Sequence, residues 1–178
     1  LVSSLYDSFI LAQDGQIEEL MLSEFMQLNL YHAPSLTRVP TASQALEIAR
    51  TDTQFNMIIA TTNVGDMPVE EFARKLHSQG VDIPLVLLTY DNREIDRLAR
   101  RGDVDLFDRV FLWQGDFRVL LAIVKYIEDK INAEHDTRVM GVQTILLVED
   151  NIRFYSAYLP MIYGELMSQS QSLLEEGM

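Results

Sequence analysis

Short, continuous apolar runs that alternate with amphipathic stretches are the feature that most constrains the fold of this 178-residue chain. Such runs are typical of strands in a parallel sheet that helices cover on both faces. The predicted strands lie at residues 9–12, 35–39, 57–60, 85–88 and 110–112. The sequence therefore predicts five βα units over residues 1–135, which form a doubly wound (βα)5 α/β domain with a parallel sheet.

The stretches between these runs carry apolar residues at helical spacing and predict the helices. The first covers residues 16–29 and the last covers 117–132. Residues that commonly begin helices are Thr41 or Ser43 and Pro68, and residues that end them are Gly80 and Gly102. Because sites in such folds lie beyond the carboxyl ends of the strands, the loops that follow the strands are where function is expected.

The opening motif recurs after a polar linker at 136–142. A second apolar run at 145–148 predicts a strand, and Glu149 and Asp150 follow it. A long helical pattern comes next, in which Pro160 is expected to produce a kink or a break. One strand and one helix cannot bury their own apolar faces. We therefore expect residues 143–178 to be the first βα unit of a second, truncated domain.

Composition excludes several classes of protein. The chain has no cysteine, which excludes disulfides and thiolate metal sites. Its net charge of −13 disfavours binding to nucleic acid or to an anionic membrane. No apolar run approaches the roughly 18 residues that span a bilayer, and no signal peptide is visible. A cytoplasmic protein with protein partners is expected.

The apolar run followed by Glu149 and Asp150 resembles the opening of the receiver domain of two-component response regulators. In that family an acidic pair after the first strand holds Mg²⁺. The resemblance implies that Glu149 and Asp150 bind Mg²⁺ in an intact second receiver. Residues 9–132 are similar to the same family in the order and spacing of their elements, and no cofactor is expected in this first domain.

The resemblance also implies a phosphoacceptor pocket in the first domain. Its residues are Gln13, Asp14, Thr61, Thr89, Tyr90 and Gln114. Thr61 stands in the place of the phosphoacceptor aspartate, Gln13 replaces one acidic residue and Gln114 replaces a lysine. Aspartyl phosphorylation needs a carboxylate nucleophile, metal ligands and a cation. The first domain is therefore expected to be a pseudo-receiver, not an enzyme; Asp66 is an alternative acceptor only in a different loop register.

Two surfaces are candidates for protein contacts. Receivers commonly pair through their fourth helix, fifth strand and fifth helix, and the residues of that face here are Arg93, Arg97, Arg101, Phe111 and Trp113. The alternative interpretation is that the arginines form a solvent-exposed helix face with no partner protein. An apolar stripe in the second unit comprises Tyr155, Leu159, Ile162, Tyr163 and Leu166. Unless it packs on the first domain, this stripe predicts a homodimer through residues 144–170.

The leading interpretation is a regulatory segment of a signal-transduction protein of the two-component or phosphorelay kind. A non-phosphorylatable receiver-like module would contact protein partners or other domains of the same polypeptide. The alternative is a flavodoxin-like small-ligand or nucleotide-binding regulatory domain of a larger enzyme, such as one resembling phosphoenolpyruvate synthase. The lack of a glycine-rich loop argues against a phosphate cradle in that pocket.

Overall fold

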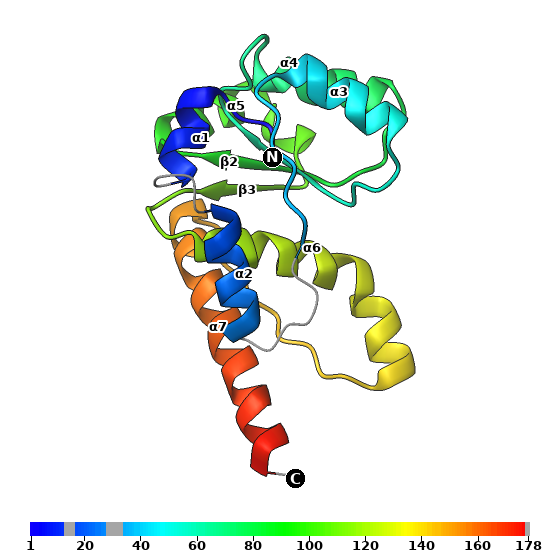
Figure 1. Ribbon diagram of the computed structural model, residues 1–178, viewed down its shortest axis with the longest axis vertical. Helices are drawn as coiled ribbons and strands as arrows, with labels where there is room; N and C mark the ends of the chain where they lie inside the picture. The colour runs from blue at the N-terminus through cyan, green and yellow to red at the C-terminus, as the bar shows by residue number, and fades with distance from the viewer. Residues whose placement is uncertain (13–16, 28–33, 177–178) are drawn as a thin grey trace.

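The computed structural model describes residues 1–12, 17–27 and 34–176. In that part of the chain the protein is α/β, with a three-stranded parallel sheet and seven α-helices (Figure 1). The strands, in the order in which they pair, are β1 (Ile58–Thr61), β2 (Leu85–Thr89) and β3 (Arg109–Leu112). Each coincides to within one residue with an apolar run that the sequence predicts as a strand.

The helices largely follow the predicted pattern. They are α1 (Leu5–Ala12), α2 (Ile17–Gln27), α3 (Ala42–Thr51), α4 (Val69–Ser78), α5 (Asn92–Arg101), α6 (Arg118–His135) and α7 (Ile152–Glu176), with short helical turns at Val104–Leu106 and Asp136–Met140. The Thr41 hydroxyl caps α3 by accepting a hydrogen bond from the Gln44 N–H (3.3 Å). Gly102 ends α5 in the left-handed conformation, with φ of 71°.

The first part of the chain differs from the prediction. The run at 9–12, expected to be a strand, lies in α1. The Ser4 hydroxyl accepts a hydrogen bond from the Asp7 N–H (3.1 Å), and Ser4 and Asp7 have the spacing of a capping box that starts a helix. The prediction of a strand at 9–12 is therefore wrong, because the chain has already passed the sheet at Val2.

Val2 extends the pairing of the sheet beyond β1. It forms isolated parallel bridges with Ala60 and with Val39. Its N–H donates to the carbonyl of Ile59 (2.8 Å). The order of pairing is thus residue 39, residue 2, β1, β2, β3, which is compatible with a flavodoxin-like arrangement. Of the strand predicted at 35–39, the structure forms only the bridge at Val39.

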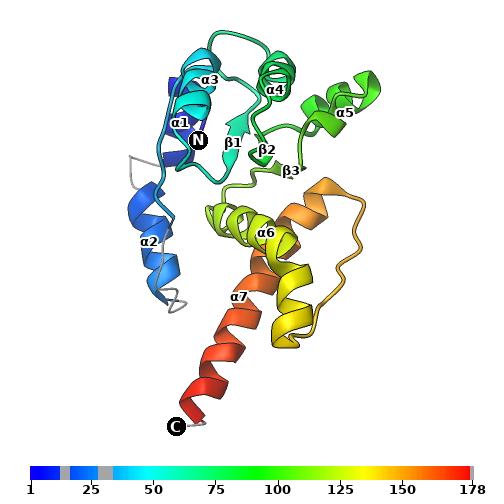
Figure 2. The same cartoon turned by 90° about the vertical axis from the view of Figure 1, so that its right-hand side faces the viewer.

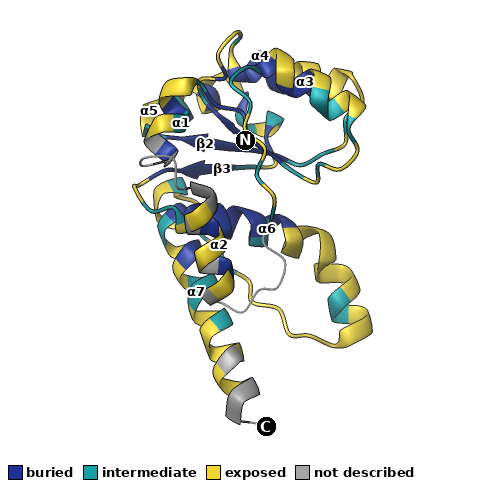
Figure 3. Ribbon diagram, in the orientation of Figure 1, coloured by how far each residue is buried: buried dark blue, intermediate teal, exposed yellow. Residues whose placement is uncertain are grey.

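Alternate residues of the strands face two separate apolar cores. Ala60, Leu87 and Leu112 belong to one core, which α3, α4 and α5 cover. Ile59, Val86 and Phe111 belong to the other, which α2 and α6 cover. The helices of the two groups lie on opposite sides of the strands (Figure 2), and the sheet between them is buried (Figure 3). The sheet is thus covered on both faces, as the continuous apolar runs indicate.

The segment between α6 and α7 forms no second sheet. Residues 141–151 contain neither helix nor strand, so the strand predicted at 145–148 is wrong. No strand of the described chain lies beside this run to pair with it. The predicted linker at 136–142 is partly helical, since Asp136–Met140 forms a π-helical turn. The division of the chain into two domains stays a prediction.

Helix α7 packs on the first part of the chain. Tyr155 and Leu159 are buried in the second core, and Tyr163 packs against it. The Ser156 hydroxyl accepts a hydrogen bond from the Leu112 N–H of β3 (2.9 Å), and the Tyr163 hydroxyl donates to Asp129 of α6 (2.7 Å). These contacts fix the helix on both sides of Pro160. Helix α7 therefore continues as one helix through this residue, where a kink or break is predicted.

The predicted apolar stripe is therefore divided. Ile162 is half-buried and Leu166 is exposed, whereas Tyr155 and Leu159 are covered by the chain itself. A homodimer through 144–170 stays a prediction, but these two residues are not free to form its contact. None of the described helices is both long and apolar enough to cross a membrane.

Candidate functional site

Two buried threonines mark the carboxyl ends of neighbouring strands. Thr61 ends β1 and Thr89 ends β2, and both side chains are fully buried. The Thr61 hydroxyl lies 3.0 Å from a carboxylate oxygen of Asp7 in α1 and 3.0 Å from the carbonyl oxygen of Asn63. The edge of the sheet at which sites of this fold class lie is therefore filled by hydrogen bonds within the chain.

The end of β2 is connected to α5 and α1 in the same way. The Thr89 hydroxyl donates to Glu94 Oε2 at 2.6 Å. The hydroxyl of Tyr90, the next residue, donates to the backbone carbonyl of Asp7 at 3.3 Å. Burial raises the pKa of Tyr90, and the negative charge of Asp7 adds to the effect. Tyr90 therefore remains a neutral hydrogen-bond donor and links the loop after β2 to α1.

Asp7 is the titratable group closest to Thr61. Its burial raises the pKa of the carboxyl group, hydrogen bonds from Thr61 and Ser4 act against this, and the nearby Glu94 carboxylate adds to the rise. A threonine hydroxyl carries one proton, so it cannot donate fully to both Asp7 and Asn63. The Asp7 carboxylate and the Asn63 carbonyl therefore compete as acceptors for this one proton.

The sequence predicts some of this site and misses its central residue. The structure places Thr61, Thr89 and Tyr90 at the carboxyl ends of β1 and β2, where Thr61 and Tyr90 both contact Asp7. Gln13 and Asp14 lie outside the described residues. Asp7 is not among the predicted residues, although the Ser4-x-x-Asp7 spacing is a capping-box signal that would have placed a helix there.

Gln114 does not contribute to the site as expected. Its side-chain amide donates to the backbone carbonyl of Arg153 in α7 at 2.9 Å. In the described part of the chain, the hydrogen-bond partners of the Thr61 and Thr89 hydroxyls are carboxylates and backbone groups, none of them cationic. Gln114 therefore helps to hold α7 in place.

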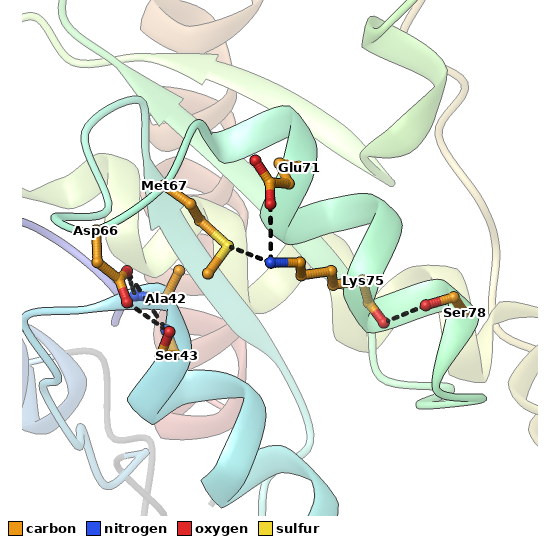
Figure 4. Close-up of polar contacts among 7 residues, drawn as sticks. All are labelled: Ala42, Ser43, Asp66, Met67, Glu71, Lys75 and Ser78. Atoms are coloured by element: carbon orange, nitrogen blue, oxygen red, sulfur yellow. Dashed lines mark hydrogen bonds and ion pairs between the residues drawn. The ribbon is translucent and has the colours of Figure 1, made fainter.

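Asp66 contacts the start of a different helix, α3. Its carboxylate accepts hydrogen bonds from the backbone N–H of Ala42 (2.9 Å) and of Ser43 at the start of α3 (Figure 4). Hydrogen bonds from Ser43 and Ala42 lower the pKa of Asp66. In the same region, Lys75 pairs with Glu71 at 2.8 Å. The Asp66 carboxylate therefore stabilises the first turn of α3, as expected for an anion at a helix N-terminus.

The predicted interaction face is split by α7. Arg93, Arg97 and Arg101 are exposed on α5, where Arg101 contacts Glu70 at 3.3 Å. Phe111, however, is fully buried, and Trp113 is nearly so, in the second core. The expectation that these two aromatic residues line a docking face is wrong for this chain, because α7 and α6 cover them.

Contacts between aromatic rings connect β3 to the helices α6 and α7 that cover it. The ring of Phe111 lies 5.4 Å from that of Tyr155 in α7 and 6.2 Å from that of Tyr126 in α6. The guanidinium carbon of Arg109 lies 4.0 Å from the centre of the Tyr155 ring. Burial raises the pKa of Tyr155 to about 12. Helix α7 is therefore attached to the free edge of β3 by several kinds of contact.

Glu149 and Asp150, the residues expected to bind Mg²⁺, lie just before α7. A carboxylate oxygen of Glu149 accepts a hydrogen bond from the Asn151 N–H (3.0 Å), and Asp150 is exposed. Across the residues that the structure describes, no group of three or more His, Cys, Asp or Glu side chains is placed to hold a metal ion. Binding of Mg²⁺ here stays a prediction for an intact second receiver.

Comparisons with protein-family models, with curated proteins and with solved structures find no match for this chain. The geometry of the strand ends and of α7 is therefore the evidence from which a function is argued.

Proposed function

We propose that this chain is a regulatory protein-interaction segment of a signal-transduction protein, and that its first domain is a receiver-like module that is not phosphorylated. The observation that carries the proposal is Thr61, which ends β1 with its hydroxyl between Asp7 and the Asn63 carbonyl. An acyl phosphate requires a carboxylate nucleophile, and a threonine at this position does not supply one.

The pairing order supports the receiver-like part of the proposal. If the single bridges at Val39 and Val2 are counted as strand positions, five positions pair in the order 2-1-3-4-5 along the chain. This is the order of flavodoxin-like doubly wound folds, whose site lies at the switch point between the first and third strands. Asp7 and Thr61 lie at that switch point.

The lack of a cationic hydrogen-bond partner of Thr61 among the described residues also argues against phosphoryl transfer. Asp7 and Glu94 place carboxyl groups at the strand ends, and Gln114 is engaged with α7. A phosphoryl group brings further negative charge and needs a metal ion or a lysine to offset it. The closed hydrogen-bond network also favours an interaction module over the alternative, a small-ligand or nucleotide-binding regulatory domain.

The exposed side of α5 supports a role in protein contact. Arg93, Arg97 and Arg100 recur at helical spacing on one line of this helix, and all three are exposed. Like charges at this spacing destabilise a helix by about 0.2–0.5 kcal/mol per pair. A partner segment that carries carboxylates at matching spacing would offset this cost, so we expect an acidic protein segment to bind α5.

The experiment that tests the proposal is a titration with beryllofluoride and Mg²⁺ followed by amide NMR. Beryllofluoride mimics an aspartyl phosphate, and we expect the amide signals of Asp7, Thr61 and Thr89 not to shift. Saturable shifts at these residues would contradict the proposal. A second titration with nucleotides tests the alternative function, which predicts saturable shifts at the same strand ends.

A further inference from the structure

We draw no further inference here: the strongest candidate, the hollow of about 340 Å³ between the turn before β3 and the start of α7, is a cluster of four acidic side chains (Asp105, Asp108, Glu149 and Asp150), and no second observation among the described residues identifies a ligand for them.

Discussion

Two apolar runs of closely similar composition have opposite environments in this molecule. Leu85-Val86-Leu87-Leu88 forms β2, which pairs with β1 on one side and β3 on the other and is fully buried. Ile145-Leu146-Leu147-Val148 pairs with no strand of the described chain and is largely exposed. Strand propensity is therefore realised only where neighbouring strands and covering helices exist.

The edge strand β3 lies between these extremes. It pairs with β2 on one side only, and α7 covers its other side. Natural sheets commonly protect an edge in this way, since uncovered backbone groups attract other chains. The run in β2 thus has two strand neighbours, β3 has one, and the run at 145–148 has none. The loss of stability caused by a substitution should decrease in the same order.

The largest effect is expected in β2. Leu87→Ala removes a fully buried side chain and should lower the free energy of unfolding by about 2–5 kcal/mol. The matched substitution Leu146→Ala changes a side chain that is 87% exposed and should cost less than about 0.5 kcal/mol. Urea denaturation at low protein concentration, where self-association does not contribute, measures both. Equal costs would show that the run at 145–148 is packed after all.

An intermediate effect is expected at the covered edge of β3. Ser156→Ala leaves the buried N–H of Leu112 without its acceptor and should cost about 1–3 kcal/mol. The opening free energy that hydrogen exchange reports for the Leu112 amide should fall by the same amount, so this amide should exchange faster.

Ser172→Ala is the control for the covered edge, because this exposed serine of α7 bonds only to its own helix. Its cost should stay within about 0.5 kcal/mol. If Ser156→Ala left the exchange of the Leu112 amide unchanged, α7 would not protect the edge of β3.

The same comparison explains which strands the sequence predicts. The strand predictions for three runs are correct, at 57–60, 85–88 and 110–112. Each of these strands lies between helices that cover opposite faces, so that a continuous apolar run packs well on both sides. The run at 9–12 fails because the local capping signal of Ser4 and Asp7 starts a helix first. The run at 145–148 fails because the presence of a neighbouring strand is not encoded in the run itself.

The candidate site follows the same logic. Thr61 and Thr89 are predictable because parallel strands bring their carboxyl ends to one edge of the sheet. Asp7 is missed because the first strand is predicted at 9–12, too late in the chain. Gln114 is misplaced because its partner, the carbonyl of Arg153, belongs to α7, whose packing on β3 is a tertiary contact between segments far apart in the sequence.

The smallest effect concerns the buried strand ends and depends on pH. The pKa of Asp7 is raised in the folded chain, so the folded state binds the proton more tightly than the unfolded state. The stability that this gives is fully present below the ordinary aspartate pKa of 3.8 and is lost as pH rises through the higher folded-state value. Asp7→Asn should remove this loss, so its stability relative to the unmodified chain should increase as pH rises through that window.

Asp66 provides a control of opposite sign. Hydrogen bonds at the start of α3 lower its pKa, so its contribution is present above 3.8 and is lost as pH falls through the lower folded-state value. Asp66→Asn should therefore make the chain less stable than the unmodified protein at neutral pH, whereas Asp7→Asn should make it more stable. Thermal unfolding from pH 3 to 7 distinguishes the two. If Asp7→Asn were destabilising at neutral pH, the Asp7 carboxylate would be a favourable partner of Thr61 in its charged form, and burial would not be the dominant influence on its pKa.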